Sequence, residues 1–161
     1  EDKKYNPDGG GSAKFIAFLE KEAQPYVDQH FKTNGQRTII GQSLGGLVAA
    51  EILLNHPALF DEYIMVSPST WWNDESLLNS ADEILTAHPL KNKRVYIAYG
   101  KEHPVMMKGA KKLFGIAKKH AGADSKVLIA YFPKEDHATI LHRAAYDCLE
   151  KLSPKPIMKT K

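Results

Sequence analysis

The sequence predicts an α/β fold with a mainly parallel sheet covered by helices on both faces. Short apolar runs, typical of buried strands, alternate with segments of helical periodicity, and no hairpin turn signal joins two consecutive runs. Parallel strands need crossover connections, which the intervening helices supply. The 161 residues, 43% hydrophobic and 25% charged, suit one compact domain with a buried core.

The first helix is expected to begin at Ser12, a plausible N-cap after a flexible segment of residues 1–11. Because proline lacks an N–H, Pro25 predicts a kink or a break in this helix. Five side chains that recur at helical spacing indicate this helix: Phe15, Leu19, Ala23, Tyr26 and His30.

Four apolar runs are expected to form the strands, and a helix is expected after each of them. The predicted strands are residues 38–40, 63–66, 95–99 and 127–132. The predicted helices are residues 47–54, 77–85, 106–117 and 140–149. Cys148 lies on the apolar side of the last helix, where a free cysteine is expected to act as a small buried hydrophobic residue. Residues 12–152 are therefore expected to form the domain, and residues 153–161 a tail.

The charge pattern argues against nucleic-acid and membrane partners. The 22 basic and 19 acidic residues give a net charge of +3, and no concentrated basic face is evident. The lysines of the helix at residues 106–117 are expected to form a solvated face. No apolar run approaches the roughly 18 residues of a membrane span. The sequence has no metal-ligand spacing, G-x-G-x-x-G or P-loop, so no metal and no cofactor is implied.

The segment Gly41-Gln42-Ser43-Leu44-Gly45 carries the clearest chemical signal in the sequence. It matches the G-x-S-x-G nucleophile elbow, follows an apolar strand directly and opens an apolar helix, which is the setting that this motif needs. Glycines at both flanks permit a tight strand-to-helix turn that exposes the Ser43 hydroxyl. The helix N-terminus offers the backbone N–H of Leu44 to a developing oxyanion, and Gln42 is expected at the same place.

A nucleophilic serine needs a base, and His137 is the histidine best placed to act as one. It follows the fourth predicted strand, and the carboxyl ends of strands are where open α/β sheets place their sites. His142 lies within the last helix, where a structural role is expected. The other candidates lie at or near helix ends: His30, His56, His88 and His120.

The acid that orients the base is expected in the loop after the third strand, where Glu102 is the natural choice. Asp136 is adjacent to His137, but neighbouring side chains diverge; Asp74, after the second strand, is a third candidate. Trp71 and Trp72 also border this edge of the sheet. They can supply an apolar wall for an acyl or aryl group, and at least one ring is expected to join the core.

Four stretches of the chain resemble the putative-esterase family of α/β-hydrolases. Members of this family include enterochelin-type siderophore esterases, S-formylglutathione hydrolases, feruloyl esterases and mycobacterial mycolyltransferases. The resemblance runs from about Gly11 to Leu152 and is strongest to the bacterial siderophore-esterase-like branch. The stretches that carry it are residues 37–46, 67–72, 99–102 and 136–139.

The resemblance implies a three-layer α/β-hydrolase sandwich in which Ser43 is the nucleophile, His137 the general base and Glu102 the acid. Family members carry further strands and a second oxyanion donor upstream, so this chain resembles the C-terminal part of the domain with its later four strands only. One sheet edge is then expected to be exposed unless a further segment or a second copy of the chain covers it. Many members are periplasmic or secreted, and the sequence itself leaves the compartment open.

The sequence thus predicts a serine esterase that acts on a small-molecule carboxylic ester through an acyl-enzyme on Ser43. Two alternatives stay open. An acyltransferase would use the same scaffold with an alcohol in place of water, and a non-catalytic binding module would keep the fold without turnover.

Overall fold

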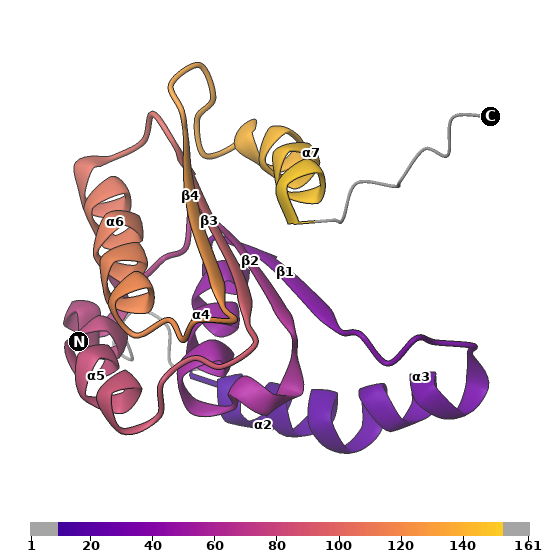
Figure 1. Cartoon of the computed structure of the whole chain (residues 1–161). Coiled ribbons are helices and arrows are strands. Elements are labelled where there is room, and N and C mark those ends of the chain that lie inside the picture. Colours follow the sequence, from indigo (N-terminus) through magenta and orange to yellow (C-terminus); the bar gives the residue numbers. More distant parts are fainter. Residues whose placement is uncertain (1–9, 153–161) are drawn as a thin grey trace.

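A computed structural model of the chain describes residues 10–152. The expected flexible segment falls mostly outside the described residues, and the expected tail at 153–161 falls entirely outside them. Within them, four strands alternate with helices (Figure 1), which confirms the predicted α/β class.

The strands form one parallel sheet in the order β1-β2-β3-β4. The register aligns Ile40 with Ile64 and Ile64 with Tyr96, so all four carboxyl ends meet at one edge of the sheet. Each strand differs from its predicted bounds by one or two residues. The strands are β1 (Thr38–Gln42), β2 (Glu62–Val66), β3 (Arg94–Gly100) and β4 (Lys126–Phe132).

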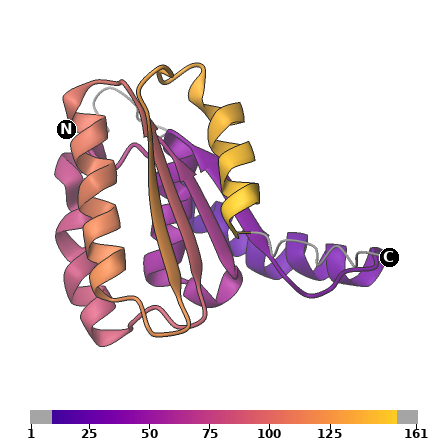
Figure 2. The same ribbon diagram turned by 45° about the horizontal axis from the view of Figure 1, so that its top comes forward.

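Helices cover the two faces of this sheet unequally, as Figures 1 and 2 show. One face packs against α4 (Leu44–Asn55), α5 (Trp72–Ala87) and α6 (Pro104–Lys119). The other face packs against α7 (Ile140–Leu152), which contacts β2, β3 and β4. The result is the three-layer arrangement expected from the resemblance.

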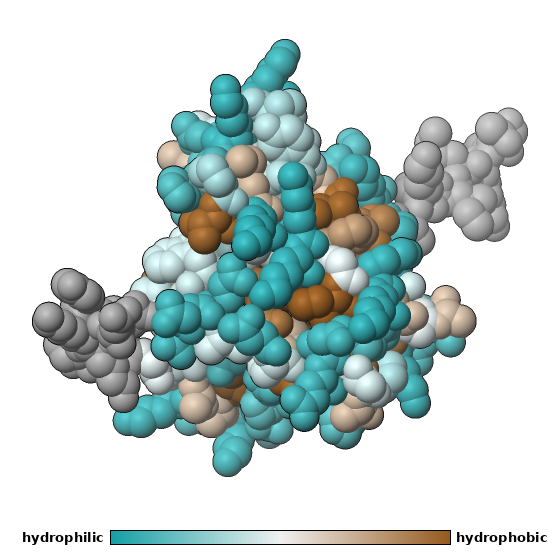
Figure 3. Space-filling view, turned by 90° about the vertical axis from the view of Figure 1, so that its left-hand side faces the viewer, coloured by the Kyte–Doolittle hydropathy of each residue, from teal (hydrophilic) through white to brown (hydrophobic). Residues whose placement is uncertain are grey.

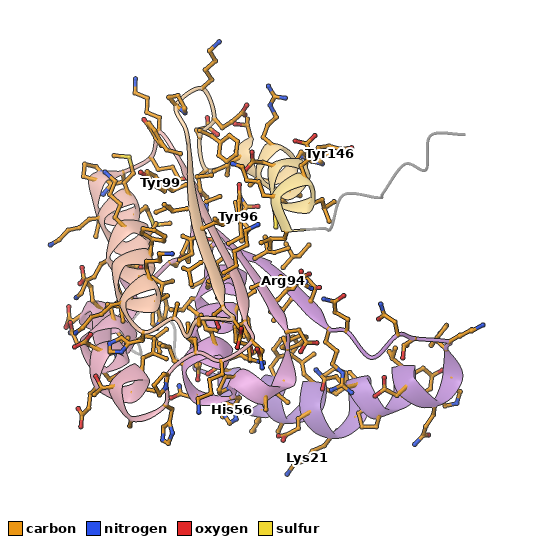
Figure 4. The ribbon with its side chains drawn as sticks, viewed as in Figure 1. Lys21, His56, Arg94, Tyr96, Tyr99 and Tyr146 are labelled. Carbon is orange, nitrogen blue, oxygen red and sulfur yellow. The ribbon has the colours of Figure 1, made fainter. Side chains whose placement is uncertain are left out.

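Alternate residues along the strands belong to two separate apolar cores, one on each face of the sheet. Tyr63 and Met65 of β2 belong to the core under α4, α5 and α6, whereas Ile64 lies in the core under α7. Tyr99 and Tyr96 of β3 divide in the same way, toward α6 and α7 respectively (Figure 4). This alternation follows from the two-residue period of a strand and explains why the strands are apolar on both sides.

The first helical segment has three consecutive parts. It comprises α2 (Ser12–Phe18), a π-helical turn η1 (Leu19–Ala23) and α3 (Gln24–His30), and α3 extends away from the sheet (Figure 1). Pro25 lies in the first turn of α3, directly after the π-helical turn. The backbone stays helical through this point, so the predicted kink or break is replaced by a local change from α- to π-helical hydrogen bonding.

The five residues at helical spacing do not form one buried face, although Leu19 packs against the core. Ile16 is the buried residue of α2, because it is the side chain that reaches the core under α4. Most of the other large apolar side chains of the segment are exposed, namely Phe15, Phe18, Tyr26 and Val27, as is Phe31 directly after it. Ile40 of the neighbouring edge strand is exposed as well.

The last helix buries Cys148, as predicted, but its apolar stripe is offset from the expected one. Ile140, Ala144 and Cys148 are fully buried at four-residue spacing, whereas Leu149 is 53% exposed. His142, for which a structural role was expected, points to solvent as well. Burial, followed by the charges of nearby carboxylates, raises the pKa of the Cys148 thiol to about 12. A thiolate nucleophile is therefore unavailable at this position.

The surface formed by α5 and α6 is largely hydrophilic (Figure 3). Lys108, Lys111 and Lys118 of α6 are exposed, which confirms the predicted solvated face. Lys112 is half-buried, and its ammonium group lies 2.8 Å from a Glu75 carboxylate oxygen. No helix among residues 10–152 is long and apolar enough to cross a membrane.

Candidate active site

Ser43 occupies a sharp turn between β1 and α4. Its backbone is left-handed, with φ of 57°, which is rare for a residue other than glycine. A Cβ on Gly41 would lie within 3.0 Å of the Gly45 carbonyl oxygen, and one on Gly46 would meet Pro68 Cα at 3.0 Å. A Cβ on Gly45 would meet nothing within 4 Å. The expectation that both motif glycines relieve crowding is therefore right for Gly41 and wrong for Gly45.

Backbone hydrogen bonds tie the loops at this edge of the sheet to one another. The N–H of Ser43 donates to the carbonyl of Val66 at 3.1 Å, and the N–H of Ser67 donates to that of Ala98 at 2.7 Å. In the next pair of loops, the N–H of Lys101 donates to the carbonyl of Glu135 at 2.7 Å. The parallel register thus continues past the strand ends and fixes the separation of the side chains that these loops carry.

Glu102 and His137 lie side by side in this edge. His137 Nδ1 lies 3.5 Å from Glu102 Oε2, and the Glu102 side chain is 2% exposed while that of His137 is 47% exposed. The other two candidate acids have different contacts, although Asp136 also lines the cavity described below. Asp136 caps its own loop by accepting from the N–H of Ala138 at 2.8 Å, and Asp74 belongs to a left-handed turn of α5.

A cavity of about 540 Å³ opens at the same edge and brings Ser43 and His137 together. Ser43 Oγ lies 3.2 Å from Ser69 Oγ, and Ser69 is 2% exposed. The residues that line the cavity are Ser43, Ser69, Trp71, Lys101, Glu102, His103, Met106, Asp136, Ala138 and His137.

Of the four residues expected to bind substrate or oxyanion, Trp71 lines this cavity. Trp72 opens α5 and lines a different hollow, beside Leu47, and neither ring is fully buried. Gln42 instead donates from Nε2 to the carbonyl oxygen of His137 at 2.5 Å. Leu44 is the first residue of α4, so its N–H has no partner within the helix.

Several residues at this edge have no role assigned from the sequence. Ser69 and Met106 line the cavity, and Ser67 donates from Oγ to Glu102 Oε1. The signal that could have found both serines is their position directly after β2, at the edge where the strands end. Within residues 10–152 no three His, Cys, Asp or Glu side chains are grouped as a metal site would require.

The sheet, its two helical layers and the elbow at Ser43 define the architecture of an α/β-hydrolase. A family model described as "Putative esterase" matches residues 1–142, so the chain belongs to that family. The predicted resemblance is confirmed.

Known proteins of this kind are similar over part of their length. The ferri-bacillibactin esterase BesA of Bacillus subtilis is 34% identical over 92 residues, which cover 56% of this chain and 32% of BesA. A siderophore enterobactin esterase of Emericella nidulans is 31% identical over 100 residues, covering 60% of this chain and 30% of that protein. The matched segments thus span about a third of these relatives.

Solved structures agree on the fold. The crystal structure of an IroE-like serine hydrolase from Shewanella oneidensis matches with a TM-score of 0.81 at 26% identity, covering 88% of this chain and 48% of that one. The BES protein from Bacillus cereus matches with a TM-score of 0.82 at 28% identity, covering 90% of this chain and 57% of that one. The chain therefore spans about half the length of these structures.

Proposed function

We propose that this chain carries the catalytic residues of a serine esterase that hydrolyses small-molecule carboxylic esters. The observation that carries the proposal is the cavity in which Ser43, at a strained elbow, meets His137 backed by buried Glu102. The siderophore esterases among the relatives support this reaction class and suggest a siderophore ester as substrate.

In this proposal Ser43 Oγ attacks the ester carbonyl and passes its proton to Nε2 of His137. The imidazole has Nδ1 turned toward Glu102, which favours the tautomer with a proton on Nδ1 and leaves Nε2 as the base. The N–H of Leu44 stabilises the oxyanion. The alcohol leaves with the proton from His137, and water activated by the same imidazole then releases the acid from Ser43.

The Ser43 hydroxyl must exchange one partner for another during this reaction. Its hydrogen bond in the structure goes to Ser69 Oγ at 3.2 Å. Catalytic hydrogen bonds commonly form only when substrate is bound, so the proposal requires Ser43 to turn from Ser69 to His137 on binding. Ser69 thereby holds the resting hydroxyl within the cavity.

The test is covalent labelling with a fluorophosphonate, followed by intact mass and peptide mapping. One adduct on Ser43 is expected, with its loss in Ser43→Ala and a fall in ester turnover of at least about 10⁴-fold. Ser69→Ala is the matched control, because it removes the other serine of the cavity and must leave the adduct in place. An adduct that survives Ser43→Ala contradicts the assignment, and ligand binding without any turnover favours a binding module.

Added alcohols separate the esterase from the acyltransferase. An esterase releases the free acid at the same rate whether or not a sugar or glycerol is present. Transfer of the acyl group to the added alcohol as the main product would instead favour the transferase.

A further inference from the structure

We propose that Ser67 is a positioning residue that holds the Glu102 carboxylate so that one oxygen faces His137. The inference rests on the proposed function, since it assigns a role to Ser67 through Glu102 and His137. It concerns the acid itself, whose orientation decides whether the imidazole is held in the productive tautomer.

The two oxygens of Glu102 have different surroundings. Oε1 accepts from the Ser67 hydroxyl and from the N–H of Gly100 at 3.2 Å. Oε2 is buried, has no hydrogen-bond partner among the described residues and lies 3.5 Å from His137 Nδ1. Two donors on Oε1 therefore fix the plane of the carboxylate and leave Oε2 as the oxygen for the imidazole.

Burial makes this contact hard to replace. Ser67 is 1% exposed and the Glu102 side chain 2% exposed, so bulk water has little access to either group. An ionised carboxylate in such surroundings depends on the donors that the protein supplies. If the Ser67 hydroxyl is removed, the carboxylate keeps Gly100 alone and is free to rotate away from His137.

The backbone at Ser67 indicates the same role. It follows β2 directly, and its N–H bonds to Ala98, which aims the side chain across the sheet edge at the loop that carries Glu102. Its φ of 46° is left-handed, a conformation that L-residues rarely adopt and that often marks a functional constraint. Glycine would adopt it without strain, so the presence of serine points to the hydroxyl.

Among residues 10–152, those that line the cavity do not include Ser67. A substitution at Ser67 therefore removes no direct contact with a substrate in the cavity. We expect Ser67→Ala to lower kcat by about 10- to 100-fold, less than the loss of general base catalysis, and to leave KM within about twofold. Ser67→Gly removes the hydroxyl while relieving the left-handed backbone, so the same loss is expected.

A double-mutant cycle with Glu102→Ala tests whether Ser67 acts through the carboxylate. In the Glu102→Ala background, Ser67→Ala is expected to have no further effect on kcat. An equal loss in both backgrounds overturns the inference, and so does full activity of Ser67→Gly. Unfolding midpoints of all variants show whether the domain stays folded, and a slowed rate of fluorophosphonate labelling gives the same readout as turnover.

Proton NMR gives a readout that does not depend on activity. The Nδ1 proton of His137 is expected as a downfield resonance, identified by its loss in His137→Ala and broadened by exchange in Ser67→Ala. A resonance that is absent from the unaltered protein, or that Ser67→Ala leaves unchanged, overturns the inference. Failure of the proposed function looks different, because Ser43→Ala would then retain turnover or labelling whatever the state of Ser67.

Discussion

The loops at the carboxyl end of the sheet and the helical segment Ser12–His30 differ in which side chains they bury. The loops bury polar groups: Ser67 is 1% exposed and Ser69 2% exposed. The helical segment exposes large apolar ones, with Phe15 at 49% and Tyr26 at 57%. Residue type alone predicts the reverse, with the serines exposed and the phenylalanine and tyrosine buried.

The difference teaches that burial follows from neighbours more than from residue type. Each loop of the site except the last donates a backbone hydrogen bond to the next strand or loop along the chain, so its polar groups find partners inside the protein. The helical segment has apolar residues at helical spacing, but only Ile16 is buried in the core, with Leu19 partly buried against it. A periodic apolar stripe predicts a helix and does not by itself predict what covers it.

The largest effect is expected from a substitution at Gly41, directly before the elbow that carries Ser43. Gly41→Ala places a Cβ within 3.0 Å of the Gly45 carbonyl oxygen, a backbone atom that cannot move without opening the elbow. We expect a loss of about 3 kcal/mol in the free energy of unfolding, measured by urea titration, together with loss of Ser43 labelling. Gly45→Ala is the control: its Cβ meets nothing within 4 Å, and a small gain of up to about 1 kcal/mol is expected. Equal losses at the two glycines would refute the crowding argument.

A smaller effect is expected within the helical segment, where two adjacent residues differ in burial. Ile16 is 2% exposed and Phe15 49% exposed. Ile16→Ala is therefore expected to lower the free energy of unfolding by about 2 kcal/mol. Phe15→Ala is expected to change it by about 0.5 kcal/mol or less, although the deletion is larger. If Phe15→Ala proves the costlier change, the segment is covered in solution and the comparison fails.

The smallest effect is expected from the contact between Lys151 and Asp147 on α7, away from the cavity. Burial raises the pKa of Asp147, but hydrogen bonds from Lys151 and Tyr96 outweigh it and hold the pKa below its ordinary value of 3.8. A lowered pKa stabilises the fold above 3.8, and this contribution is lost as the pH falls through the folded value. Lys151→Met is expected to cost about 0.2–1 kcal/mol at pH 7. In urea titrations the difference from the unaltered protein should shrink toward pH 3, and a difference independent of pH would contradict it.

Much of the fold followed from local patterns. The four strands lie within one or two residues of their predicted bounds because a buried parallel strand is a short apolar run with clear ends. The register of the last helix was less certain, since Cys148 and Leu149 are adjacent and both apolar. Packing against the sheet, which the sequence does not display, selects Cys148 for the core.

The site was predictable where strand ends determine it and unpredictable where loop paths do. Glu102 lies beside His137 because both follow adjacent parallel strands. Trp71 and Trp72 are adjacent and their ring centroids lie 5.9 Å apart, yet Trp71 lines the cavity and Trp72 a different hollow. The three left-handed residues that follow, 73–75, have no glycine to announce their turn. The partner of Gln42 is equally hidden, because it belongs to a loop 95 residues further along the chain.

That contact between Gln42 and His137 has a consequence for how the chain acquires its chemistry during folding. The elbow is local and forms with β1 and α4, but the imidazole arrives only when β4 has joined the sheet. Closing so long a loop is slow compared with local helix formation. If Ser43 and His137 act as proposed, a refolding chain holds an unreactive serine until β4 is paired, and reactivity of Ser43 reports that pairing.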